Sequence, residues 1–143
     1  MGVTEKDRGR HIVAGTPIIV PLVVPGALVA GNGKAHYKWV HFPATVMQIV
    51  ATLQTLHTTS TGGGGESVMV RNVTDTADLM TTANKIVFTD TYVDSIPVEK
   101  SSTQLQNRDL AIGDVLSIDV DVIDTGTGAA DLTVFIVAER KVD

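Results

Sequence analysis

Residues 113–138 read GDVLSIDVDVIDTGTGAADLTVFIVA, and two stretches of this segment alternate between apolar and other residues. A two-residue period is typical of β-strands, in which successive side chains point to opposite faces. The Gly-rich segment between the two stretches provides a connection, so the whole predicts a β-hairpin. The apolar positions expected to face a core are Leu116, Ile118, Val120 and Val122 in the first stretch and Leu132, Val134, Ile136 and Ala138 in the second.

The composition of the whole chain extends this β pattern. Val and Thr account for 21 and 18 of the 143 residues, and both are β-branched side chains that favour strands. A chain of this length forms one domain by default and is long enough to bury a core. It contains no Cys, which excludes disulfides and thiolate metal sites. The net charge of −5 argues against nucleic acid or an anionic membrane surface as a partner.

Further strands are expected upstream of the hairpin, over residues 45–55, 66–74 and 86–93. Asn32-Gly33 favours a tight type I′ turn, because both positions tolerate positive φ. About eight short strands separated by frequent turns predict an all-β fold, an antiparallel β-sandwich or jelly roll. The upstream residues expected inside its core are Met47, Ile49, Leu53 and Val70.

The stretch GTPIIVPLVVPGALVAG, residues 15–31, is almost entirely apolar and carries prolines at positions 17, 21 and 25. A membrane-spanning helix is excluded, because each proline removes a backbone donor and clashes with the preceding turn. A signal peptide fits poorly, since Glu5 and Asp7 interrupt its basic start and Pro and Gly break its apolar region. An extended strand fits best, because prolines four apart all lack N–H groups on the same lateral edge. Such a strand pairs on one side only.

Two interpretations of this strand remain open. It is either an edge strand of its own sandwich or an arm laid along a neighbouring subunit, and its two apolar faces favour the arm. We therefore expect an extended N-terminal arm over residues 1–35 and a β-sandwich domain over residues 36–143. The residues expected to bind a partner through the arm are Pro17, Ile18, Ile19, Val20, Pro21, Leu22, Val23, Val24 and Pro25. The residues expected at an oligomer interface, on the second apolar face of the last strand, are Thr133, Phe135 and Val137.

Candidate catalytic and metal-binding residues do not form a recognisable motif. The carboxylates Asp119, Asp121 and Asp124 are oxygen ligands of the kind that Ca²⁺ prefers, but the spacing of an EF-hand loop is absent, so a solvated strand face is favoured. His36, His41 and His57 do not have zinc-site spacing. No nucleophile elbow and no P-loop occur. The sequence therefore predicts no catalytic residue, no metal site and no cofactor, and a small β-sandwich or cupin-like enzyme is the least favoured function.

Tyr37 and Trp39 lie two residues apart in the segment HYKWVHF, so on a strand they share one face. Two aromatic rings on one face can stack on a sugar, as they do in carbohydrate-binding sandwiches. Packing in the core or at an interface is the favoured alternative for Trp39.

The order of elements resembles that of small β-sandwich proteins encoded by tailed bacteriophages. The resemblance spans residues 42–137 and is carried by FPATVMQIVATLQT, by the Gly-rich loop after it, and by DLAIGDVLSIDVDVIDTGTGAADLTVFIV. A G-D-V-L-x-(I/V)-D-V strand, a Gly/Thr loop and a D-L-T-V strand recur in the head-decoration and head-fibre proteins of these phages. The first 35 residues have no counterpart in this pattern.

The resemblance implies a virion structural protein. Its expected function is that of a capsid decoration, or cement, protein that binds the outer surface of a phage head and stabilises it. The implied partners are the major capsid protein and sister subunits in a homotrimer, and the implied location is the capsid surface of the virion. A carbohydrate- or receptor-binding β-sandwich module of a phage fibre or spike is the alternative.

Overall fold

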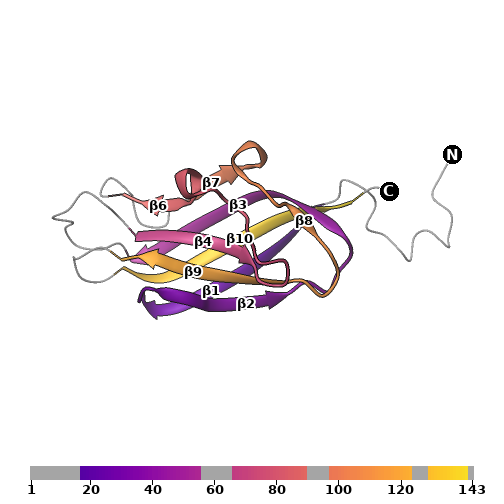
Figure 1. Ribbon diagram of the computed structural model, residues 1–143. Coiled ribbons are helices and arrows are strands. Elements are labelled where there is room, and N and C mark those ends of the chain that lie inside the picture. The colour runs from indigo at the N-terminus through magenta and orange to yellow at the C-terminus, as the bar shows by residue number, and fades with distance from the viewer. Residues whose placement is uncertain (1–16, 56–65, 90–96, 124–128, 142–143) are drawn as a thin grey trace, which may run out of the picture.

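The computed structural model describes residues 17–55, 66–89, 97–123 and 129–141, and these form two antiparallel sheets packed face to face (Figure 1). In sheet A the strand order is β1-β10-β3-β7, with β8 also on β3, and in sheet B it is β2-β9-β4-β5, with β6 also on β4. The strands of sheet A are β1 Pro17–Ala27, β10 Ala130–Arg140, β3 Ala44–Thr55, β7 Val98–Ser101 and β8 Asp109–Leu110. Those of sheet B are β2 Gly31–Lys38, β9 Val115–Val122, β4 Glu66–Asn72, β5 Ala77–Asp78 and β6 Ile86–Phe88.

The strand order corresponds to one long antiparallel ribbon folded over on itself. β1 pairs with β10, β2 with β9 and β3 with β8, so the two halves of the chain run side by side in opposite directions. Folding such a ribbon so that alternate pairs enter opposite sheets gives a jelly roll. The predicted all-β sandwich is confirmed. Two short 3-10 helices, η1 Thr82–Asn84 and η2 Ser102–Gln104, are the helical segments of the described residues.

The proline-containing stretch forms β1, and β1 is an edge strand of this chain's own sheet A. It pairs with β10 on one side only, in the register Ile19↔Val137, Pro21↔Phe135 and Val23↔Thr133. The side chains of Val20 and Leu22 point into the core, with 4% and 3% of their surfaces exposed. The one-sided pairing expected from the proline spacing is therefore confirmed. No helix in the described part of the chain has the length and hydrophobicity needed to cross a bilayer.

The predicted arm over residues 1–35 is wrong for the portion that the structure describes. After β1 the chain continues directly into β2, the edge strand of sheet B, and the Leu28 N–H donates to the Ala129 carbonyl on the way. The physical reason is that three alternate side chains of β1, together with Leu28, complete the core beside β10. A boundary at residue 35 would thus cut through β2. Residues 1–16 lie outside the described residues.

The core residues predicted from the alternation are buried, except Met47, for which the prediction is wrong. The side chain of Val122 lies outside the described residues. The register between β10 and β3 shifts between Val137 and Ala138, because Gln48 lies opposite the former and Val46 opposite the latter. Met47 is the extra residue of this β-bulge, and it reverses the inward and outward assignment of the residues before it. Val46 therefore occupies the core and is fully buried, while Met47 is only partly buried.

Asn32-Gly33 does not form the predicted type I′ turn. Both residues lie inside β2, where the register against β9 shifts between Gly31 and Ala35. Gly33 has φ +64°, whereas Asn32 is not among the residues with positive φ, and a type I′ turn needs positive φ at both positions. Gly33 instead opens a bulge, and its N–H donates to Asp119 Oδ1 at 2.8 Å.

We predict that Leu22→Ala lowers the free energy of unfolding by about 2–5 kcal/mol, because it leaves a cavity between β1 and the opposite sheet. Val29→Ala serves as the matched control, since Val29 lies between β1 and β2 with 59% of its surface exposed, and its effect stays within about 0.5 kcal/mol. Urea denaturation of the three proteins measures both values. Equal effects of the two substitutions would contradict the placement of β1 in the core.

Candidate functional site

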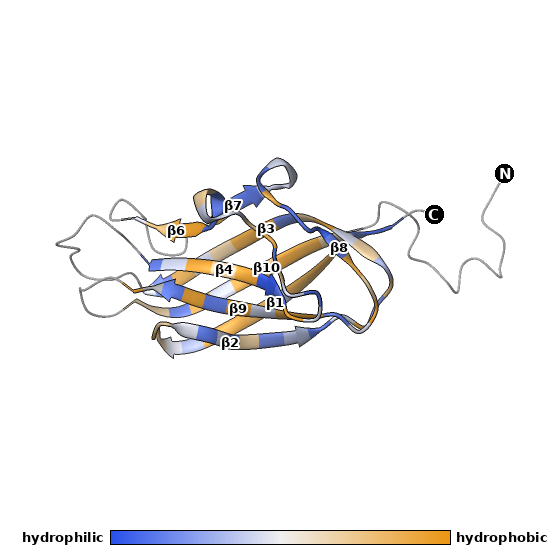
Figure 2. Cartoon of the chain, in the orientation of Figure 1, coloured by the Kyte–Doolittle hydropathy of each residue, from blue (hydrophilic) through white to orange (hydrophobic). Residues whose placement is uncertain are grey.

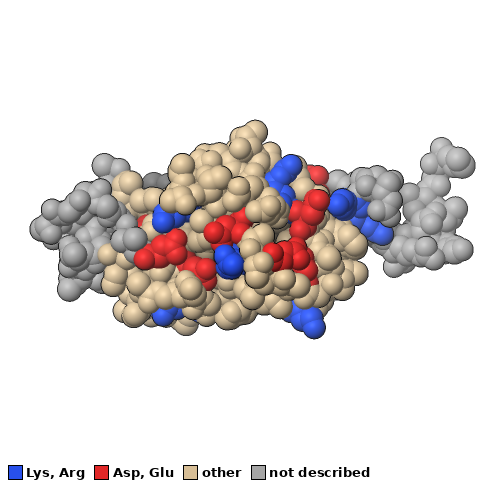
Figure 3. Space-filling view, in the orientation of Figure 1, with Lys and Arg blue, Asp and Glu red and all other residues tan. Residues whose placement is uncertain are grey.

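The outer faces of the two sheets differ in chemical character. Figure 2 shows orange segments along β3 and β10 of sheet A and along β4 of sheet B, whereas blue and pale segments alternate along β2. Figure 3 shows Asp, Glu, Lys and Arg side chains gathered over the outer face of sheet B, which faces the viewer. The outer face of sheet B is therefore polar.

The outer face of sheet A is built from alternate residues of three neighbouring strands. Phe135 of β10 lies opposite Pro21 of β1 on one side and Val50 of β3 on the other. The next row places Val137 opposite Ile19. We call this set the apolar face: Ile19, Pro21, Val23, Val50, Phe135 and Val137.

The apolar face is exposed although the core beneath it is complete. Ile19 and Val23 have 62% and 52% of their surfaces exposed, while Phe135, Val137 and Val50 are partly buried. Residues 17–24, 133–137 and 48–52, which cover the middle of the three strands, include no charged residue. Contiguous exposed apolar surface of this kind marks an interaction site on soluble proteins.

The structure separates the residues predicted to bind a partner into two groups. Val20, Leu22 and Val24 are buried in the core and are unavailable to a partner, so their assignment as binding residues is wrong. Ile18 is partly buried. The exposed members of the stretch share the outer side of sheet A with the predicted interface residues of β10; these are Pro17, Ile19, Pro21, Val23 and Pro25 on β1 and Thr133, Phe135 and Val137 on β10. Two sets predicted separately therefore lie side by side.

The free edge of β1 is poorly suited to further strand pairing. The N–H and C=O groups of one residue point to the same lateral edge, so the residues with outward side chains also direct their backbone groups away from β10. Along this edge only Ile19 and Val23 carry an N–H group, because the three residues between and beside them are prolines. The edge is blunted against sheet extension, which leaves the face as the usable surface.

Trp39 is unavailable for stacking on a sugar. Its surface is fully buried, and its indole Nε1–H donates to the Phe42 carbonyl. Tyr37 is partly buried, its ring contacts Trp39 edge-on with a centroid distance of 6.3 Å, and its hydroxyl lies 2.7 Å from His41 Nε2. The paired platform of Tyr37 and Trp39 considered from the sequence is therefore wrong, because β2 ends before Trp39 and the chain turns it into the core.

The acidic residues of β9 lie on the outer face of sheet B. Asp119 is buried, with 7% of its surface exposed, and Asp121 is exposed; Asp124 and His57 lie outside the described residues. Within the described ranges, no three His, Asp or Glu side chains come close enough together to hold a metal ion. Asp119 and Asp121 instead line one groove together with Arg71, Asp78 and Lys85, three residues that the sequence analysis did not identify. Their only sequence signal was polar residues at outward positions of the strands.

One further ion pair lies at the end of sheet A, where Asp109 of β8 is opposite Thr45 of β3. Lys141 Nζ is 3.1 Å from Asp109 Oδ2, and this hydrogen bond lowers the pKa of Asp109, with the charge of Lys141 acting in the same direction and burial opposing it. The pair fastens the end of β10 to β8. Any stability it adds is present above the unfolded-state pKa and is lost as the pH falls through the folded-state pKa. The pair is well exposed, so that contribution is small.

Comparison of the chain with protein-family models, with curated proteins and with solved structures gave no match.

We predict that the fluorescence of Trp39, the only tryptophan of the chain, is emitted at short wavelength and is poorly quenched by acrylamide, because the indole is buried. Neutral sugars at millimolar concentration leave this emission unchanged in the folded protein. Unfolding in urea shifts the emission to long wavelength and serves as the control. Efficient quenching in the folded state would place Trp39 at the surface and restore it as a sugar-stacking candidate.

Proposed function

We propose that this chain is a structural assembly protein that binds sister copies through the apolar face. The observation that carries the proposal is an exposed apolar patch in the middle of the outer face of sheet A, bordered by Glu99 and Glu139, on a sandwich whose core is already filled. An antiparallel sheet that faces water alternates apolar and polar residues, so the apolar outward positions of β1 and of the middle of β10 are typical of a covered surface. Each Val, Ile or Phe side chain that a partner buries fully contributes about 1.5–3 kcal/mol.

The assembly that fits this surface is closed rather than open-ended. Strand addition along β1 would join sheets edge to edge and continue into fibres, and the prolines of β1 oppose it. Packing of apolar faces around a common axis buries the same residues in every copy and then stops. A homotrimer is the form that the resemblance to phage β-sandwich proteins favours.

The proposed biological role is that of a capsid decoration protein, which binds the major capsid protein on the outer surface of a phage head and stabilises the particle. Support comes from the strand-and-turn resemblance carried by residues 42–137. The small size of the sandwich also suits a structural protein that is bound to the surface of a particle. Several weak contacts per oligomer add up through avidity, so a trimer holds a shell more firmly than one copy.

We predict that the wild type sediments as an oligomer, that Ile19→Asp yields a folded monomer, and that Ile112→Asp leaves the oligomer intact. A charge in the apolar face would have to be buried without a partner, which costs more than the contact gains. Ile112 is the matched control, because it is equally exposed, at 61% against 62%, but lies in the turn before β9. Analytical ultracentrifugation over a range of concentrations measures the mass, and far-UV circular dichroism checks the fold.

Phe135→Asp provides a second test at the centre of the same face, and we expect it to weaken the oligomer in the same way. A wild type that sediments as a monomer at every concentration, and that also binds particles as single copies, would contradict the trimer. Dissociation by Ile112→Asp as well as by Ile19→Asp would move the interface away from sheet A.

We predict that purified protein cosediments with capsids assembled from the major capsid protein of the virus that encodes it, and that these capsids resist heating better than bare ones. Ile19→Asp binds the capsids more weakly, because it loses avidity, whereas Ile112→Asp binds as the wild type does. Capsids that neither bind nor gain stability would reject the decoration role while leaving the oligomer in place.

A further inference from the structure

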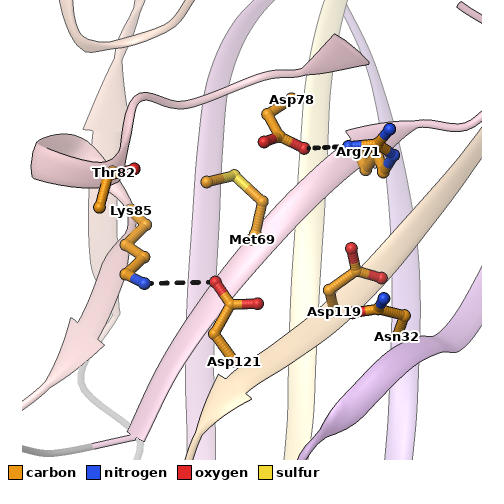
Figure 4. Close-up of a pocket in the computed structure, with 8 residues that line it drawn as sticks. All are labelled: Asn32, Met69, Arg71, Asp78, Thr82, Lys85, Asp119 and Asp121. Carbon is orange, nitrogen blue, oxygen red and sulfur yellow. Dashed lines mark hydrogen bonds and ion pairs between the residues drawn. The ribbon is translucent and has the colours of Figure 1, made fainter. Parts of the chain in front are cut away.

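A polar groove crosses the outer face of sheet B, on the opposite side of the sandwich from the apolar face (Figure 4). Its volume is about 440 Å³, within the range of about 300–1,000 Å³ that small-molecule sites occupy. β4 and β9 form its floor, while β2, β5 and the segment around η1 form its walls. A second hollow of about 360 Å³ shares Asn32, Arg71 and Asp119 with it and extends it toward His36.

Two ion pairs line the groove, and within each pair the two opposite charges neutralise one another. Arg71 Nη1 lies 2.9 Å from Asp78 Oδ1, and Lys85 Nζ lies 3.3 Å from Asp121 Oδ2. Figure 4 shows Met69 between the two pairs, and only 6% of its surface is exposed. The groove therefore offers hydrogen-bond donors and acceptors in alternation, with little net charge from these four side chains.

Asp119 is the unusual group, because its carboxylate is buried without a cation beside it. Only 7% of its surface is exposed, and the ion pairs of the described residues do not include it. Both hydrogen bonds that it receives within the described part of the chain, from the Gly33 N–H at 2.8 Å and from Ser117 Oγ at 3.4 Å, end on Oδ1. No hydrogen bond within the described part of the chain ends on Oδ2, and Oδ2 is not among the fully buried atoms there, so it is an acceptor open to water or to a ligand.

The Asp119 carboxylate points toward the Arg71–Asp78 pair across the groove (Figure 4). A ligand between them meets an acceptor on one side and a guanidinium on the other, which has five N–H donors and donates one hydrogen bond to Asp78. A hydroxyl group satisfies both, because it donates one hydrogen bond and accepts others. The Lys85–Asp121 pair and the Asn32 amide line the same groove and offer donors and acceptors to further hydroxyl groups of the ligand.

We infer that this groove binds a neutral saccharide, with hydroxyl groups that bridge Asp119 Oδ2 and the Arg71 guanidinium. Charged ligands fit less well. An anion meets the carboxylates of Asp119 and Asp121, whereas a cation beside Asp119 also meets the Arg71 guanidinium across the groove. Sugars present many hydroxyl groups that both donate and accept hydrogen bonds, and the groove is lined by side chains that do the same.

The backbone holds these groups in place before any ligand arrives. Asp119 lies on β9, which is paired on both sides, with β2 and with β4. The bulge at Gly33 brings its N–H onto Oδ1, which fixes the carboxylate and leaves Oδ2 as the free acceptor. Sites on paired strands with second contacts of this kind keep their geometry and lose less entropy on binding.

The saccharide site is independent of the proposed assembly. The apolar face and the groove belong to different sheets, so assembly through sheet A leaves sheet B facing away from the interface. A structural protein with this arrangement presents one sugar-binding groove per copy on its outer surface. Failure of either proposal leaves the other intact, because sedimentation reports on the first and sugar titration on the second.

The test uses the full chain labelled with ¹⁵N and titrated with methyl glycosides of neutral hexoses and with neutral disaccharides. Amide chemical shifts are recorded, and the Gly33 amide is the principal reporter, because it donates directly to Asp119. We expect at least one neutral saccharide to shift the Gly33 amide together with those of β4 and β9 in a saturable manner, while amides on the apolar face do not move.

Asp119→Asn is the decisive variant. It keeps the Oδ1 acceptor for Gly33 and Ser117 but replaces the free acceptor with an N–H₂ donor, and we expect the saccharide affinity to fall about tenfold or more. Asp109→Asn is the control, since it makes the same chemical change at the exposed pair with Lys141, outside the groove, and leaves the affinity unchanged. Asn32→Ala, at an exposed side chain of the groove, weakens binding without risk to the core.

Three results would overturn the inference. The first is the absence of saturable shifts with every neutral saccharide of the panel. The second is equal affinity of the wild type, Asp119→Asn and Asn32→Ala, which would mean that the sugar binds elsewhere. The third is a titration in which calcium chloride alone shifts the Gly33 amide and the sugars do not, which would make the groove a cation site.

Discussion

The pairing of β10 with β1 on one side and β3 on the other is the constraint on which the rest of the structure depends. It brings residues 17–27, 44–55 and 130–140 together from both halves of the chain into one sheet. Once β10 is paired on both edges, β2 and β9 follow as neighbours in the opposite sheet, because each continues directly from a strand of the first. The two-residue period then sends Leu132, Val134 and Ile136 into the core and Thr133, Phe135 and Val137 outward.

The prolines of β1 define how the outer side of sheet A can be used. Their four-residue spacing gives all three the same orientation, so the inner edge keeps every donor for β10 and the outer edge keeps few. A strand that is apolar on both faces and blunted on its edge is protected from sheet extension but not from face-to-face packing. The prolines of β1 therefore block extension of the sheet and leave the outer side chains of sheet A as the surface for association.

The two outer faces differ in their chemistry. Sheet A presents side chains that gain free energy by leaving water, and sheet B presents ion pairs and the carboxylate of Asp119, which gain nothing from apolar contact. Because the strands of a sandwich alternate inward and outward, substitutions at the outward positions of one sheet change its binding chemistry without altering the shared core. A structural role on one side and ligand recognition on the other are compatible within 143 residues.

The sequence by itself determined the fold class, most of the core and the one-sided pairing of the proline-containing strand, because these depend on local period and on the missing proline donors. The tertiary structure decided what period cannot express. One bulge placed Val46 in the core in place of the expected Met47. A second bulge, in β2, replaced the expected turn at Asn32-Gly33 and made the Gly33 N–H a donor to Asp119. The placement of β1 in its own sheet was open in the sequence, because an edge with donors pairs equally well with any partner strand. The groove around Asp119 was invisible for a related reason: its residues come from β2, β4, β5, β9 and the segment around η1, and only the order of strands in sheet B brings them together.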